Sequence, residues 1–169
     1  IGDFNPQDMA NTAWAFATAD VAAETLFQAI AGAAVNRIGD FNPQNMANTV
    51  WAFATAGVAT ETLFGTIAGA AANRIGDFNP QDLANTAWAF ACIGWKHSDL
   101  FTLLGSALLE RLGMLNDIQK SQLYVVTVYF QTEWPHLEFP LSAHVRSLRS
   151  AYTRQEPNPS QLQCDVSTM

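Results

Sequence analysis

The sequence contains little charge, little cysteine and no apolar segment long enough to cross a membrane. Charged residues make up 14% of the 169 residues and hydrophobic residues 49%, which is typical of a folded chain and excludes a disordered one. The longest apolar stretches, Ala47–Ala59 and Leu63–Ala72, are broken by Asn48, Thr49 and Glu61. A membrane-spanning helix needs about 20 apolar residues, so we expect no contact with a membrane.

Metal-binding and catalytic motifs are missing as well. Cys92 and Cys164 occur singly, with no CxxC motif and no histidine at ligand spacing. The spacing predicts neither a zinc site nor a disulfide framework, and we expect both thiols to be unpaired. No GxSxG, P-loop, HExxH or GxGxxG motif occurs. We therefore expect no metal, no cofactor and no enzymatic activity.

Positive charge is also scarce. The net charge is −7 and no segment is basic overall, which argues against strong non-specific binding to phosphates and against DNA as a ligand. The one locally basic stretch carries Arg146, Arg149 and Arg154 on an expected helix. We expect these three arginines to form a solvated face.

An internal repeat dominates what the chain does contain. The segment FNPQDMANTAWAFA at Phe4–Ala17 returns with few changes at Phe41–Ala54 and at Phe78–Ala91, with a step of 37 residues each time. A period of this length is typical of stacked supersecondary units. The sequence therefore predicts an all-α fold, a right-handed α-solenoid of stacked helix-turn-helix repeats.

Each unit is expected to contain two helices. Asn5 is placed to cap the first helix, Pro6 suits its first position, and the helix is expected to end at about Thr18. A second helix is expected from about Glu24 to Arg37, after a short turn. Helical spacing gathers the apolar residues of the first helix on one broad face. The tryptophans at the edge of this face are expected to pack in the core and not to stack on bases: Trp14, Trp51 and Trp88.

The repeat also predicts how the chain is divided. The expected units are 1–37, 38–74 and 75–114, then a diverged capping unit at 115–154 with its signature helix at 119–133, then a linker and the start of a further helix at 155–169. In this alignment Leu112–Met114 are three extra residues. Because the chain begins at Ile1 at the start of a repeat, we expect it to be a piece of a longer array, with any targeting signal outside it.

Polar side chains recur as a row on the first helix of each unit. The row consists of Gln7, Asp8, Asn11, Gln44, Asn45, Asn48, Gln81, Asp82 and Asn85. Amide side chains can pair with base edges, and modular RNA-binding repeats use two or three such side chains for each base. The alternative for each residue is a structural role, in solubilising the outer face or in capping neighbouring turns.

A second row consists of one arginine at the end of each unit: Arg37, Arg74 and Arg111. These side chains could follow the phosphates of an RNA ligand. We expect a mainly structural role instead, because a cation at a helix C-terminus complements the helix dipole. Asp40 and Asp77 also lie three residues after the first two arginines and offset their charge.

The motif of the first helix, FNPQ followed by LANTAWAFA or a close variant, resembles the heptatricopeptide-type and octotricopeptide-type repeats of RAP-domain and FAST-kinase-like organellar RNA-binding proteins. The resemblance covers Ile1–Arg111. The segments Gln122–Phe130 and Pro159–Val166 are similar to the region that precedes the RAP domain, which the sequence itself does not include. The resemblance implies single-stranded RNA as ligand, other organellar RNA-processing proteins as partners, and a place in mitochondria or chloroplasts.

The repeat and the resemblance together predict an RNA-binding helical-repeat protein that acts in the processing, stability or translation of organellar RNA. By this resemblance, the polar residues of the first helices would face RNA on the concave side. The rival is a protein-interaction scaffold of the HEAT or tetratricopeptide kind. The acidic balance and the lack of a basic groove favour the rival.

Overall fold

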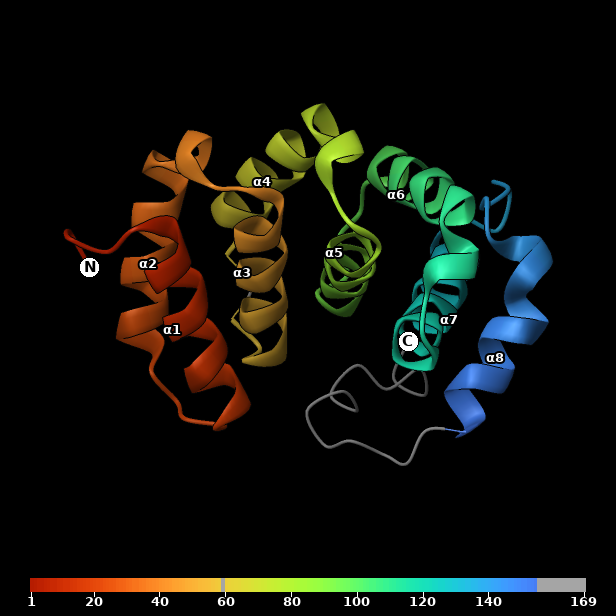
Figure 1. The fold of residues 1–169 in the computed structure, drawn as a ribbon, viewed down its shortest axis with the longest axis horizontal. Coiled ribbons are helices and arrows are strands. Elements are labelled where there is room, and N and C mark those ends of the chain that lie inside the picture. Colours follow the sequence, from red (N-terminus) through yellow and green to blue (C-terminus); the bar gives the residue numbers. More distant parts are fainter. Residues whose placement is uncertain (59, 155–169) are drawn as a thin grey trace.

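Helix pairs stack side by side in the computed structural model of this chain, which describes residues 1–58 and 60–154 (Figure 1). The helices are α1 (Pro6–Thr18), α2 (Glu24–Asn36), α3 (Pro43–Thr55), α4 (Glu61–Asn73), α5 (Pro80–Cys92), α6 (Ser98–Glu110), α7 (Asp117–Glu133) and α8 (Val145–Arg154). Short 3-10 turns lie at Ile38–Asp40, Ile75–Asp77, Leu112–Met114 and Ser142–His144. The starts of α1, α3 and α5 repeat at the 37-residue step, which confirms the predicted all-α repeat fold.

A reciprocal pair of hydrogen bonds begins each of the odd-numbered helices. Asn5 Oδ1 accepts a hydrogen bond from the Asp8 backbone N–H at 2.9 Å, and Asp8 Oδ2 accepts one from the Asn5 N–H at 3.0 Å. This capping box satisfies two backbone donors that a helix N-terminus leaves without partners. The same arrangement recurs as Asn42 with Asn45, Asn79 with Asp82, and Asn116 with Gln119. Local sequence therefore decides where these helices start.

The helices form two layers of an arch (Figure 1). α1, α3, α5 and α7 form the inner layer and pack closely on one another, whereas α2, α4 and α6 lie on the outer side and touch each other much less. Closer spacing on one side than on the other curves a stack of repeats. The inner helices therefore line the concave side.

Edge-to-face phenylalanine pairs join each outer helix to the next inner helix. The Phe27 ring of α2 lies 4.9 Å from the Phe53 ring of α3, and the Phe64 ring of α4 lies 5.3 Å from the Phe90 ring of α5. All four rings are buried, and such pairs contribute about 0.5–1.5 kcal/mol beyond the area that they bury. One helix pair cannot cover these rings alone, so the next pair completes the core.

The 37-residue step continues into the fourth helix pair. Leu112–Met114 form the counterpart of the turns before α3 and α5, and Asn116 caps α7 37 residues after Asn79 caps α5. The prediction of three extra residues at Leu112–Met114 is therefore wrong, and α7 begins at Asp117, not at Gln119. The cap reveals the register, which the diverged side chains of α7 hide.

α8 covers the far end of the stack. Its Tyr152 ring lies 5.1 Å from the Tyr124 ring of α7, and its Leu148 and Ala151 are buried. This is the capping position expected of a terminal repeat. The exact unit boundaries stay a prediction, and the expected linker and helix start at 155–169 lie outside the described residues.

Cys92, the last residue of α5, is disulfide-bonded. The prediction of unpaired thiols is therefore wrong at this position. Distance in space and not separation along the chain decides whether cysteines pair, so spacing in the sequence was a poor guide. Cys164 lies outside the described residues.

We expect Phe53→Ala to lower the free energy of unfolding by about 3–5 kcal/mol, the usual loss for a large buried aromatic side chain. Phe16 occupies the same position in α1 but is only half-buried, so Phe16→Ala should cost clearly less. Urea unfolding curves recorded by circular dichroism give the loss of unfolding free energy for both variants. Equal losses would contradict the role assigned to the Phe27–Phe53 pair.

Candidate functional site

One face of each inner helix points away from the core. In α3, Gln44, Asn48 and Trp51 follow one another at i, i+4 and i+7 and so share a face. This face lies opposite the buried residues Met46 and Phe53, and Phe53 packs on the outer helix α2. Because α3 lies on the concave side of the arch (Figure 1) and its opposite face packs towards the outer layer, we infer that the shared face looks into the concave side.

Amide side chains form a row along this concave side, with two in each of α1, α3 and α5. We call it the amide row: Gln7, Asn11, Gln44, Asn48, Gln81 and Asn85. All six side chains are exposed or half-exposed. Within the described part of the chain, only Asn85 of this row forms a side-chain hydrogen bond, in which its Oδ1 accepts from Gln122 Nε2 at 3.2 Å. The other amides keep their donors and acceptors available to a ligand.

Gln122 extends this row into α7, 37 residues after Asn85. It is only 5% exposed, and its Oε1 is buried without a hydrogen-bond partner among the described residues. The sequence prediction did not include Gln122, because its alignment of the fourth unit was three residues out of register. The capping residue Asn116 is the signal that would have placed it.

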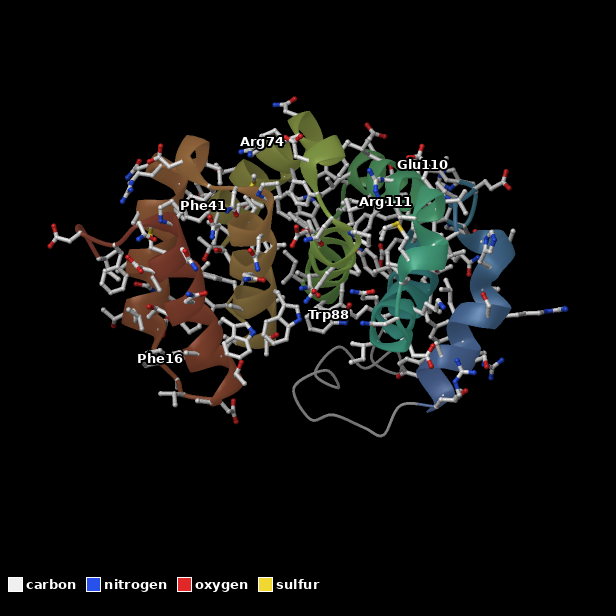
Figure 2. All side chains as sticks on the ribbon, viewed as in Figure 1. Phe16, Phe41, Arg74, Trp88, Glu110 and Arg111 are labelled. Carbon is white, nitrogen blue, oxygen red and sulfur yellow. The ribbon has the colours of Figure 1, made fainter. Side chains whose placement is uncertain are left out.

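Indole rings lie beside the amide row. Trp51 and Trp88 stack with their ring centroids 6.1 Å apart, and Trp88, which is only 2% exposed, lies on the concave side (Figure 2). Trp14 is 48% exposed. The prediction that all three tryptophans pack in the core therefore holds for Trp88 and is wrong for Trp14. These residues lie at the edge of the apolar face, where coverage depends on neighbouring elements.

The residues at the third position of each inner helix serve the helix itself. Asn45 and Asp82 are only 7% and 5% exposed, and each accepts a capping-box hydrogen bond through its side chain. Asp8 makes the same bond but is exposed. Burial leaves Asn45 and Asp82 little surface for a ligand, which favours the structural alternative for this part of the predicted row.

Two of the three arginines in the row join the end of an outer helix to the start of the same unit. Arg37 Nη1 donates to the Phe4 carbonyl oxygen, and Arg74 Nη1 donates to the Phe41 carbonyl oxygen, both at 2.7 Å (Figure 2). Each of these arginines also pairs with the aspartate three residues on, at 3.3 and 3.7 Å. Arg111 donates instead to a carbonyl oxygen of α6 at 2.9 Å. These contacts favour a structural role over phosphate binding.

Charge is absent from the amide row, and cations elsewhere are few. Over residues 1–58 and 60–154, the basic side chains without an ion pair are Lys120, Arg146 and Arg149. The same residues include no cluster of side chains that could hold a metal ion and no helix long and apolar enough to span a membrane. The concave surface is therefore suited to hydrogen bonding and stacking, and little suited to binding phosphates.

The fold and this surface define a helical-repeat protein whose first three repeats present the same polar side chains. The family model described as RNA-editing substrate-binding complex 6 protein matches residues 1–133, and the chain belongs to this family. The family consists of non-catalytic subunits of an RNA-editing complex and points to mitochondrial RNA processing. A comparison with curated proteins found no match.

The family corrects the resemblance stated from the sequence. The match supports a helical-repeat protein of organellar RNA processing, but not the RAP-domain and FAST-kinase-like group and not a chloroplast setting. The motif misled because its features are general ones. An Asn cap, a Pro at the first position and small apolar residues on one face are what any tightly stacked helix needs.

Burial raises the pKa of the Asp82 carboxyl above its ordinary value of 3.8, and the hydrogen bond from the Asn79 N–H offsets only part of this effect. The ionised carboxylate therefore destabilises the fold at neutral pH. As the pH falls through the raised pKa towards 3.8, the folded state takes up a proton before the unfolded state does, and this cost disappears.

We therefore expect Asp82→Asn to raise the urea midpoint at pH 7, with a gain that shrinks as the pH is lowered through the raised pKa. An asparagine can fill this position, because Asn45 caps α3 in the same way. Asp8→Asn, at the exposed equivalent position, is the matched control and should gain much less. A gain for Asp82→Asn that does not change with pH would contradict the assignment.

Proposed function

We propose that this chain binds single-stranded RNA along its concave side, as a subunit of an RNA-editing substrate-binding complex in mitochondria. Family membership supports the complex and the compartment. The observation that carries the RNA contact is the amide row, whose side chains recur in α1, α3 and α5 and, apart from Asn85, have no hydrogen-bond partner within the described residues. Trp14 and Trp51 lie beside it with exposed ring surface.

The chemistry of the amide row and of the neighbouring indole rings fits unpaired bases. An amide both donates and accepts hydrogen bonds, so it can meet the base edges that a single strand leaves open. An indole ring supplies a stacking surface that accepts any base. Because α1, α3 and α5 present the same residue types at the same positions, the contacts repeat, and we propose that the array discriminates little between sequences.

The residues at the third position of the inner helices and the arginine row have other roles in this proposal. Asp8, Asn45 and Asp82 complete the capping boxes of the inner helices. Arg37 and Arg74 link the end of the outer helix to the start of the same unit in the first two units. A scaffold function is the second candidate, and the specific observation in its favour is an open apolar edge at α1 and α2, where Phe16 and Leu26 are only half-buried.

We expect Trp14→Ala to weaken binding of a single-stranded RNA by roughly 5- to 150-fold, the equivalent of about 1–3 kcal/mol for one stacked base. Fluorescence anisotropy with a labelled RNA of mixed sequence measures the change. The urea midpoint should stay nearly constant, because Trp14 is largely exposed. Gln28→Ala on the outer helix α2 is the control and should leave affinity unchanged. No RNA binding by the folded wild-type chain would sink the proposal.

Replacing Gln44 and Asn48 together by alanine should also weaken RNA binding without loss of stability, since neither side chain has a hydrogen-bond partner among the described residues. The matched control is Asn45→Ala, which removes a capping side chain and should cost stability, about 1 kcal/mol, before it affects RNA. If the double variant loses stability and keeps its RNA affinity, these amides are structural.

We expect the RNA affinity to depend weakly on salt, because the amide row contains no cation. With at most one phosphate contact, Kd should rise less than about threefold between roughly 50 and 200 mM salt, whereas six contacts would raise it by more than about 100-fold. Anisotropy titrations at several salt concentrations give the slope. A steep dependence of Kd on salt would mean that RNA binds outside the amide row. Arg146 and Arg149 of α8 would then be the next residues to replace.

A further inference from the structure

The face of α1 and α2 at the start of the array is open, although its counterparts in the next two units are buried. We call it the leading edge: Phe4, Thr12, Ala15, Phe16 and Leu26. Each of these side chains is exposed or half-exposed. The residues 37 positions on are all buried, and so are those 74 positions on: Phe41, Thr49, Ala52, Phe53, Leu63, Phe78, Thr86, Ala89, Phe90 and Leu100. What covers them is the preceding helix pair, because α3 packs on α1 and α5 packs on α3.

Phe16 is the member of its series that lacks an aromatic partner. Phe53 receives the ring of Phe27 from the preceding outer helix, and Phe90 receives the ring of Phe64 in the same way, at 4.9 and 5.3 Å. Phe16 makes no ring contact with any residue in the described part of the chain. The leading edge thus offers one half of a pair that the structure forms twice elsewhere.

A hollow lies beside this ring. Phe16, Val21 and Phe27 line a cavity of about 480 Å³ together with Gly57 and Val58 from the turn between α3 and α4. Because Gly57 and Val58 belong to the second unit, this hollow lies at the junction of the first two units and leaves the Phe16 ring loosely packed on that side as well.

We propose that the leading edge is a docking surface for a further helix pair of the same repeat type. By the geometry of the internal interfaces, the first helix of this added pair would pack small residues on Ala15, as α1, whose Ala10 and Ala13 are buried, packs on α3. Its second helix offers an aromatic ring to Phe16, as α2 offers Phe27 to Phe53. This surface is separate from the amide row and does not depend on RNA binding.

A second copy of this chain does not fit the edge in the head-to-tail manner of the internal interfaces. Such stacking needs an uncovered inner helix at the other end of the array. There α8 lies on α7, with Leu148 and Ala151 buried and Tyr152 against Tyr124. The matching end of a second copy is therefore closed (Figure 1).

The test is to join a copy of residues 38–74 directly before Ile1 of the full chain. The new Arg74–Ile1 junction reproduces the natural Arg74–Ile75 junction. If the edge docks a helix pair, the added unit folds on it, and urea unfolding stays cooperative with a higher midpoint. Phe16→Ala should then lower the midpoint of the extended protein as much as Phe53→Ala does, although it has little effect in the original chain. Gln28→Ala, outside the edge, should not change the gain.

An added unit that proteases remove readily, with an unchanged midpoint for the remainder, would overturn the proposal. So would a Phe16→Ala effect that is equally small with and without the added unit. Sedimentation velocity of the original chain covers the remaining alternative: a dimer that Phe16→Ala disperses would put a second copy on the edge and contradict the assignment. RNA titration of the same proteins reports on the amide row alone, so failure of one proposal is distinguishable from failure of the other.

Discussion

Burial between consecutive helix pairs is the constraint on which the rest of this structure depends. A single pair exposes apolar side chains on two sides, and the rings of Phe27 and Phe64 become buried only when the next pair brings Phe53 and Phe90 against them. Each inner helix from α3 onwards is therefore held between two neighbours. This requirement explains why the small residues of the motif recur so strictly, since bulky ones would keep the inner helices apart.

The same constraint selects the surface that is left for function. An inner helix that is covered on two sides and backed by an outer helix keeps one free face, which looks into the concave side. Along that face the residue types of Gln44, Asn48 and Trp51 repeat in α1, α3 and α5. The stacking geometry thus turns a short motif into a continuous row. The row is neutral because its members are amides, and nearby charged residues make structural contacts, such as that of Arg74 with the Phe41 carbonyl oxygen.

Much of the fold follows from local signals. Asn5, Asn42, Asn79 and Asn116 each begin a helix by the same pair of hydrogen bonds, which needs only residues within one turn. The diverged fourth unit shows where such signals weaken: its proline and tryptophan are gone, and the remaining asparagine alone marks the register. The motif alone also suggested the wrong repeat family, because the features that allow helices to stack are shared by unrelated repeat families.

The repeat period, the helix starts and the apolar stripe were determined by the sequence alone, because each depends on residues a few positions apart. Accessibility was decided only by the tertiary structure. Asp8 and Asp82 occupy the same position in the motif, yet one is exposed and the other is buried with a raised pKa. Trp14 and Trp88 differ in the same way. The physical reason is that the covering side chains come from other elements of the fold, which the local pattern does not contain.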